Sequence, residues 1–212
     1  MESFTEEELK GYIIYLNFIQ QKLDKYFDEQ RPFICCKKGC GKCCKQQQFP
    51  YTQIEMQYLI TGVLSLDADT REKVENNLNE IIEEHKKYKN RKNPLKRKFK
   101  YDCPFLIDNV CCVYDYRGLI CRCFGLMIKP EDGKVNIPFC CFEGLNYSNV
   151  MNLKAKQFSK RKYKSLKTEK TPNVYQVGYE QLVDEDLAKG FGFKFGKVKA
   201  MIDWFEEFKE NM

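Results

Sequence analysis

Apolar residues recur at helical spacing near both ends of the chain. The first such stretch covers residues 5–29 and predicts an amphipathic helix. Its apolar face consists of Leu9, Tyr12, Ile13, Leu16, Ile19, Leu23 and Phe27. Thr5 and Glu8 fit a capping box at its start, because each side chain can accept a hydrogen bond from the other residue's backbone N–H. A final amphipathic helix is predicted over about 197–210, where the apolar face includes Val198, Met201, Ile202 and Phe205.

Two further helices are predicted between residues 50 and 89. Pro50 to Thr52 should start the first, with Thr52 and Glu55 as a second capping box and Gly62 as its C-terminal stop. Asp67 or Asp69 should cap the next helix, which runs to about residue 89. Its buried face is predicted to contain Val74, Leu78, Ile81, Ile82 and His85. We expect this histidine to be a packed residue that makes one hydrogen bond.

The middle of the chain has the short apolar runs and turn residues of β-hairpins. Residues 103–114 predict a hairpin that turns at Asp108-Asn109, and residues 130–133 predict the turn of a second hairpin. Residues 117–124 are predicted to form a turn or a short helix. Residues 154–170 are predicted to form a helix or an exposed connector, and residues 172–195 to form an extended, packed segment. The predicted fold class is therefore α+β, with helices at both ends packed around a small, irregular β-hairpin region.

Length and composition favour a globular protein. The 212 residues are 43% hydrophobic and 31% charged, which excludes disorder throughout. We expect a single domain over 1–212, with a cysteine-rich core over 30–145 and a C-terminal extension over 146–212. The acidic N-terminus has no apolar signal region, and no apolar run is long enough to span a bilayer. The chain is therefore expected to be cytoplasmic, with no membrane partner.

The net charge of +6 is distributed unevenly. Residues 86–100 contain nine Lys and Arg and no acidic residue, and residues 154–170 contain eight Lys and Arg and one Glu. We interpret 89–100 as a basic linker. Nucleic-acid binding is conceivable but not favoured, because no recognisable nucleic-acid module accompanies the basic residues.

Cysteine is the unusual feature of the composition, with 12 Cys and a single His. Five cysteines lie within residues 35–44, and the others lie at 103, 111–123 and 140–141. In a reducing compartment, clustered cysteines are more often metal ligands than disulfides. Sulfur ligands suit zinc or an iron–sulfur cluster, so a Cys-ligated metal centre is predicted to staple the β-hairpin region.

The order and spacing of these cysteines carry a resemblance to a known family. The pattern is Cys36-x3-Cys40-x2-Cys43-Cys44, then Cys103-Pro-Phe-Leu, then Cys112-Val-Tyr114-x2-Arg117-x3-Cys121-Arg122-x-Phe124. Over about residues 36–125 it resembles the YkgJ-type cysteine cluster proteins, bacterial proteins described as having a zinc- or iron-chelating domain. The resemblance implies these ligands: Cys36, Cys40, Cys43, Cys44, Cys103, Cys112 and Cys121, completed by Cys140 or Cys141. Gly118 departs from the family, which usually has proline there. Cys35, Cys111 and Cys123 are extra to the pattern and are expected to be buried or spare thiols.

The predicted function is a metal–cysteine protein with an iron–sulfur cluster, of the 4Fe–4S type, or zinc. It would act in metal handling or redox, with a redox or protein partner. One alternative is a cluster-dependent enzyme that uses S-adenosylmethionine, because the flagellin lysine methylases look like distant relatives of the cysteine pattern. Another alternative is a zinc-stabilised module that binds nucleic acid or protein. Whether the chain is an enzyme stays open at this point.

Two arginines adjoin the predicted ligands. Arg117 and Arg122 could donate hydrogen bonds to cluster sulfurs or bind an anionic cofactor. They could equally pair with carboxylates such as Asp102 and Asp115.

Overall fold

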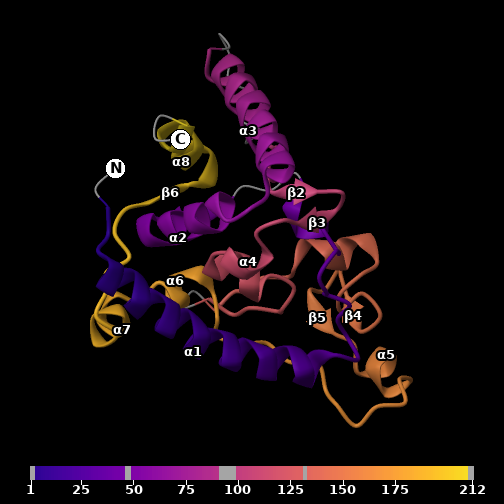
Figure 1. Ribbon diagram of the computed structural model, residues 1–212. Helices are drawn as coiled ribbons and strands as arrows, with labels where there is room; N and C mark the ends of the chain where they lie inside the picture. Colours follow the sequence, from indigo (N-terminus) through magenta and orange to yellow (C-terminus); the bar gives the residue numbers. More distant parts are fainter. Residues whose placement is uncertain (1–2, 46–48, 91–98, 131–132, 210–212) are drawn as a thin grey trace. The chain divides into compact units, whose positions relative to one another are not determined.

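The computed structural model describes residues 3–45, 49–90, 99–130 and 133–209 of the chain. These residues are mostly helical, with three two-stranded antiparallel sheets (Figure 1). The chain forms two compact units, the first from residues 1–9, 38–118 and 195–212 and the second from residues 10–37 and 119–194. Helix α1 (Glu6–Gln30) begins in the first unit and continues into the second. The expected single domain stays a prediction.

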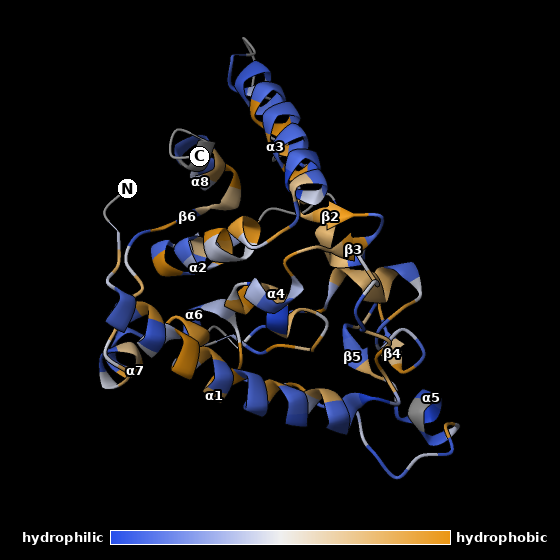
Figure 2. Ribbon diagram, in the orientation of Figure 1, coloured by the Kyte–Doolittle hydropathy of each residue, from blue (hydrophilic) through white to orange (hydrophobic). Residues whose placement is uncertain are grey.

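Helices α2 (Gln53–Leu64) and α3 (Ala68–Lys89) of the first unit confirm two predicted helix starts. The Thr52 backbone N–H donates to Glu55 Oε2 at 2.8 Å, and the Glu55 N–H donates to Thr52 Oγ1 at 3.3 Å. Asp67 Oδ1 accepts from the Thr70 N–H at 2.8 Å and caps α3. Figure 2 shows α3 as mainly hydrophilic with apolar residues between. The predicted buried face of α3 is confirmed, because Val74, Leu78, Ile81, Ile82 and His85 are all buried.

The predicted stop of the second helix was wrong. Gly62 lies inside α2, and the helix continues to Leu64. A Cβ atom at position 62 would lie 2.4 Å from Cγ of Tyr116. The glycine is therefore needed for the close approach of the 3₁₀ helix η2 (Tyr114–Tyr116), not for a turn.

The first unit contains a two-stranded β-ladder that was not predicted. Strand β1 (Pro50–Thr52) pairs with β6 (Val198–Ala200), with Tyr51 opposite Lys199. Helix α8 (Met201–Lys209) follows directly and places Trp204 in the core, where its Nε1–H donates to the Tyr51 carbonyl at 2.8 Å. The ladder occupies the start of both stretches that were predicted as helix.

The hairpin predicted over 103–114 is confirmed. Strands β2 (Leu106–Ile107) and β3 (Val110–Cys111) are antiparallel and joined by Asp108 and Asn109. Both turn residues have positive φ, 50° and 63°, as in the type I′ turns that suit the twist of two-residue hairpins.

The second unit consists of most of α1 and several short elements. These are α4 (Leu119–Cys123), the 3₁₀ helix η3 (Phe139–Glu143), β4 (Met151–Asn152), β5 (Gln157–Phe158), α5 (Lys160–Lys164), α6 (Tyr179–Leu182) and α7 (Glu185–Gly190). The short helix in 117–124 is confirmed. The extended reading of 172–195 was wrong in part, because Asp184 caps α7 by accepting from the N–H groups of Asp186 and Leu187.

Two other predictions for this unit are met only partly. The second hairpin is limited to one antiparallel bridge between Ile128 and Asn136, and residues 131–132 of its turn lie outside the described residues. The β4–β5 hairpin lies in part of the stretch that was predicted as helix or connector. Most of the basic linker, residues 91–98, also lies outside the described residues.

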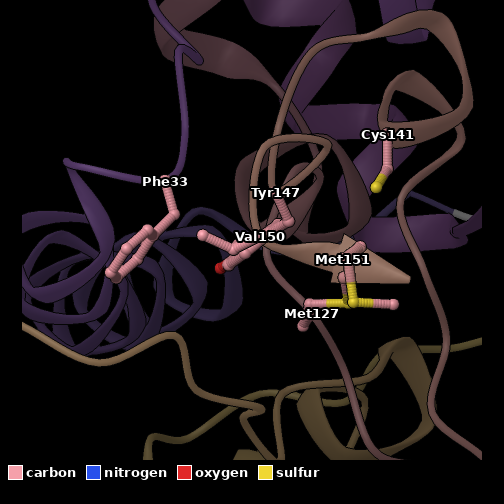
Figure 3. Close-up of a cluster of buried hydrophobic side chains, with 6 residues drawn as sticks. All are labelled: Phe33, Met127, Cys141, Tyr147, Val150 and Met151. Atoms are coloured by element: carbon pink, nitrogen blue, oxygen red, sulfur yellow. The ribbon is translucent and has the colours of Figure 1, made fainter. Parts of the chain in front are cut away.

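The core of the second unit includes an apolar cluster around Tyr147 (Figure 3). Its buried members are Phe33, Met127, Cys141, Tyr147, Val150 and Met151. The backbone of Tyr147 is tied to the end of α1, because its N–H donates to the Phe33 carbonyl at 2.6 Å. Among the described residues, none of the helices combines the length and the apolar character that crossing a bilayer requires.

Gly11 and Gly190 make a matched pair of helical glycines with opposite expected effects. A Cβ at Gly11 would lie 2.3 Å from the backbone oxygen of Phe191, whereas nothing lies within 4 Å of a Cβ at Gly190. We expect Gly11→Ala to destabilise the protein by about 1–3 kcal/mol through overpacking. Gly190→Ala should stabilise the protein by about 0.5–1 kcal/mol, because alanine has a higher helix propensity than glycine. Urea unfolding measures both, and equal shifts for the two variants would contradict the packing at Gly11.

Candidate metal centre

All twelve cysteines lie in the described part of the chain, and none of them is in a disulfide bond there. The two units hold six each. The first unit contains Cys40, Cys43, Cys44, Cys103, Cys111 and Cys112, and the second contains Cys35, Cys36, Cys121, Cys123, Cys140 and Cys141. The predicted ligands are therefore divided between the two units.

In the first unit, the cysteine loop lies against the β2–β3 hairpin. The Cys103 N–H donates to the Cys44 carbonyl at 2.7 Å, so these two backbones are in direct contact. Gly41 has φ 60°, and a Cβ there would lie 3.3 Å from the Asn109 carbonyl oxygen of the hairpin turn. The loop ends in the 3₁₀ helix η1 (Lys42–Cys44). The structure thus brings the backbones of Cys44 and Cys103 together, and their assignment as metal ligands stays a prediction.

The environment of Cys44 favours a thiolate. The pKa of the Cys44 thiol is lowered to about 7, mainly by a hydrogen bond from the Cys43 thiol. The Arg117 charge lowers this pKa further, whereas burial and the Asp102 charge raise it. Arg117 is itself held in place, because its Nε donates to the Tyr114 carbonyl at 2.7 Å and its guanidinium lies 3.4 Å from the Tyr114 ring centroid. Arg117 therefore acts on the cysteines electrostatically from a fixed position.

Cys112 has the opposite environment, because burial raises the pKa of its thiol to about 11. Its N–H donates to the Phe105 carbonyl at 2.9 Å, which places it on the far arm of the hairpin. A metal ion must displace the thiol proton to bind this sulfur.

We expect iodoacetamide to alkylate Cys44 faster than Cys112 in metal-free, reduced protein. At pH 7 about half of Cys44 is thiolate, against about one in ten thousand for Cys112. The Cys112 thiolate is more basic and therefore more nucleophilic, which offsets part of the difference in thiolate fraction. Cys44 should then be alkylated on the order of 50- to 100-fold faster than Cys112. Peptide mass spectrometry should show the Cys44 rate levelling off above pH 8 while that of Cys112 still rises. Equal rates at pH 7 would contradict these two environments.

In the second unit, Cys36 lies against Gly125 and the buried amide of Asn146. The Asn146 Nδ2 donates to Cys36 Sγ at 2.8 Å, and Asn146 is only 1% exposed. Gly125 has φ 110°, and a Cβ there would lie 2.4 Å from Cys36 Sγ. The adjacent Cys35 donates its thiol proton to Asn146 Oδ1 at 3.2 Å.

The other cysteines of this unit lie on short helices. Cys140 and Cys141 are buried on η3, and burial raises the pKa of the Cys141 thiol. Burial also raises the pKa of the Tyr147 hydroxyl, and the charges of neighbouring groups that include Cys36 and Cys140 raise it further. Tyr147 therefore lies within electrostatic range of cysteines from two separate segments.

The remaining residues of the predicted site lie on or just before α4. Cys121 and Cys123 are both on α4, and Cys123 is fully buried, with its thiol donating to the Ile120 carbonyl at 3.5 Å. The Arg122 Nη1 donates to Gln20 Oε1 at 2.8 Å. This bond orients Arg122 toward α1.

Among the described residues, no group of three or more His, Cys, Asp or Glu side chains is arranged to hold one metal ion. His85 matches the expected packed histidine, since its Nδ1 lies 3.4 Å from Glu206 Oε1 and its side chain is buried.

Asn146 was missed by the reasoning from sequence. It lies in a stretch without any cysteine spacing or metal motif, and its only sequence signal is a polar residue between Leu145 and Tyr147. In the structure the stretch leads into the apolar cluster, which explains why an amide there is buried beside the cysteines.

A comparison with known proteins finds no family model, no curated protein and no solved structure that matches the chain. The resemblance to the YkgJ-type cysteine cluster proteins thus stays a hypothesis that depends on the cysteine motifs.

Proposed function

We propose that the protein binds an iron–sulfur cluster or zinc through cysteine thiolates and acts in metal handling or redox. The observation that carries the proposal is the contact between Cys44 and Cys103, which are far apart in sequence and joined by a 2.7 Å backbone hydrogen bond. A hydrophobic core has no need to bring partly exposed cysteines from two separate segments together. A metal that takes several sulfur ligands has that need.

The donor chemistry fits such a group. The candidate ligands of the first unit are Cys40, Cys43, Cys44, Cys103 and Cys112. Cys43 and Cys44 are adjacent and hydrogen-bonded through their thiols, so one of these sulfurs is already a good acceptor. A metal bound here would require the ligand sulfurs to turn about their χ1 torsions toward one point.

The surrounding charges support thiolate ligation. A metal with four thiolates carries net negative charge, which nearby cations stabilise. Arg117 and Lys38 both lie against the Tyr114 ring, with the Lys38 Nζ 5.3 Å from its centroid. In the finer form of the proposal, the bound metal staples the loop of residues 39–45 to the β2–β3 hairpin.

The test is metal and sulfide analysis of protein purified without oxygen. We expect either iron with acid-labile sulfide or zinc, in whole-number ratio to the chain. Chelation should release the metal and lower the thermal midpoint, because binding free energy at such a site contributes to folding free energy. A fully folded preparation without iron or zinc, whose stability a chelator leaves unchanged, would refute the proposal.

A further inference from the structure

The side-chain amide of Asn146 lies between Cys35 and Cys36 and is oriented by two backbone groups. Its Oδ1 accepts from the Cys35 backbone N–H at 2.9 Å, and its Nδ2 donates to the Gly125 carbonyl at 3.1 Å. A backbone N–H can only donate and a carbonyl can only accept. These two bonds therefore determine which end of the amide is oxygen and which is nitrogen.

The two adjacent thiols meet opposite ends of this amide. Cys36 Sγ lies 2.8 Å from Nδ2 and accepts its second hydrogen, whereas Cys35 Sγ lies 3.2 Å from Oδ1 and donates to it. A sulfur that ligates a metal has lost its proton and gains from an N–H donor. The Cys35 sulfur instead faces an amide oxygen, which accepts hydrogen bonds and offers no N–H to a ligand sulfur. The amide thus suits Cys36 as a ligand and Cys35 as a thiol.

Gly125 restricts Cys36 from another side. Its φ of 110° suits glycine, and the 2.4 Å separation between a Cβ there and Cys36 Sγ shows that the sulfur lies directly on the glycine backbone. Because Asn146 is 1% exposed, water cannot easily replace its hydrogen bond to the sulfur. The position of this sulfur is therefore defined by the protein before any metal binds.

We infer that Asn146 is the positioning residue of the Cys36 ligand and selects Cys36 over its neighbour Cys35. The inference rests on the proposed metal binding, and it assigns to Asn146 the hydrogen bond that orients a ligand sulfur of the second unit. Removing such a partner costs about 10- to 100-fold in metal affinity. It also changes the electronic properties of the metal, which hydrogen bonds to the ligand sulfur tune.

The test compares Asn146→Asp with the matched control Asn152→Asp in the full chain. Asn152 is exposed, and its Oδ1 accepts from the N–H groups of Lys154 and Ala155, a role that aspartate retains. We expect metal affinity to fall about 10- to 100-fold in Asn146→Asp and to stay unchanged in the control.

The thiolate-to-metal charge-transfer band separates positioning from a general loss of structure. It is measured on the bound iron or, in a zinc protein, on Co²⁺ put in its place. The band should shift to lower energy in Asn146→Asp, because the sulfur loses its N–H donor, and should not move in Asn152→Asp. Unchanged affinity and an unmoved band in Asn146→Asp would overturn the inference.

A second measurement on the unmodified protein decides the case if Asn146→Asp does not fold. Metal-loaded protein is treated with iodoacetamide, and tandem mass spectrometry assigns the label to Cys35 or Cys36. We expect Cys35 to be labelled and Cys36 to be protected. If the protein contains metal and Cys35 is the protected residue, the role of Asn146 is refuted but the proposed metal binding is not. If the protein contains neither iron nor zinc, the proposed function and the role of Asn146 are both refuted.

Discussion

Substitution of Cys103 by serine should remove most of the iron or zinc from the protein. The Cys103 backbone N–H donates to the Cys44 carbonyl at 2.7 Å, so the two residues are neighbours in space. A serine hydroxyl is a poor ligand for a metal that prefers thiolate. We expect bound metal per chain to fall about tenfold or more on anaerobic purification, because one lost ligand weakens a site whose affinity depends on all of them.

Cys111→Ser is the matched control for this experiment. Cys111 lies on the same hairpin, on β3 opposite Leu106, and is extra to the family pattern. We expect it to retain the metal content of the unmodified chain. If Cys111→Ser loses as much metal as Cys103→Ser, the hairpin matters only as a whole and the assignment of Cys103 as a ligand is wrong.

The thermal midpoint of the metal-stripped chains separates ligand loss from misfolding. Without metal, Cys103→Ser should melt close to the unmodified chain, since the substitution changes one partly exposed atom. The two should differ only when metal is present, because ligand binding stabilises only the chain that binds. A large difference between the stripped chains would attribute the metal loss to unfolding instead.

The helix starts could be predicted because they depend on residues three apart. In the Thr5–Glu8 and Thr52–Glu55 capping boxes, the side chains and the N–H groups they satisfy belong to the same turn. The Asp108-Asn109 turn is equally local, since it depends on the tolerance of these two residues for positive φ. Such signals need no knowledge of the rest of the chain.

The errors arise where the deciding contact is distant in sequence. Pro50–Thr52 becomes a strand because Val198–Ala200 pairs with it. Gly62 lies inside a helix, and the ring of Tyr116 that packs onto it explains why the residue is glycine. Neither partner can be read from the local pattern. The same holds for Asn146, whose importance depends on the meeting of Cys36 and Gly125 in space.

The candidate site was proposed from the cysteine pattern, which is evidence of a different kind. Spacing within residues 35–44 indicates which sulfurs can reach one metal, but the link to Cys103 came from the family resemblance. The structure places the backbone of Cys103 against that of Cys44 and does not test whether both sulfurs bind a metal. It also shows the opposed environments of the Cys44 and Cys112 thiols. These depend on the hydrogen bond from the Cys43 thiol, on burial and on the Arg117 charge, and the spacing of the cysteines does not predict them.

Trp204→Ala should be among the most destabilising substitutions in the first unit. The indole is 1% exposed on α8, and its Nε1–H donates to the Tyr51 carbonyl of the β1–β6 ladder. Truncating a buried tryptophan to alanine costs about 3–5 kcal/mol through lost packing and the cavity left behind. Trp204→Phe keeps most of the packing and removes the donor, so it should cost about 1–3 kcal/mol. Urea denaturation of metal-stripped protein measures both.

Phe18→Ala serves as the control for loss of an aromatic side chain at the surface. Phe18 is 49% exposed, so its truncation should stay within about 0.5–1 kcal/mol. The expected order of destabilisation is Trp204→Ala, then Trp204→Phe, then Phe18→Ala. A Trp204→Phe variant as stable as the unmodified chain would show that the bond to Tyr51 adds nothing to packing. The β1–β6 ladder would then be held by the α8 core alone, since backbone pairing over three residues is marginal without a packed face.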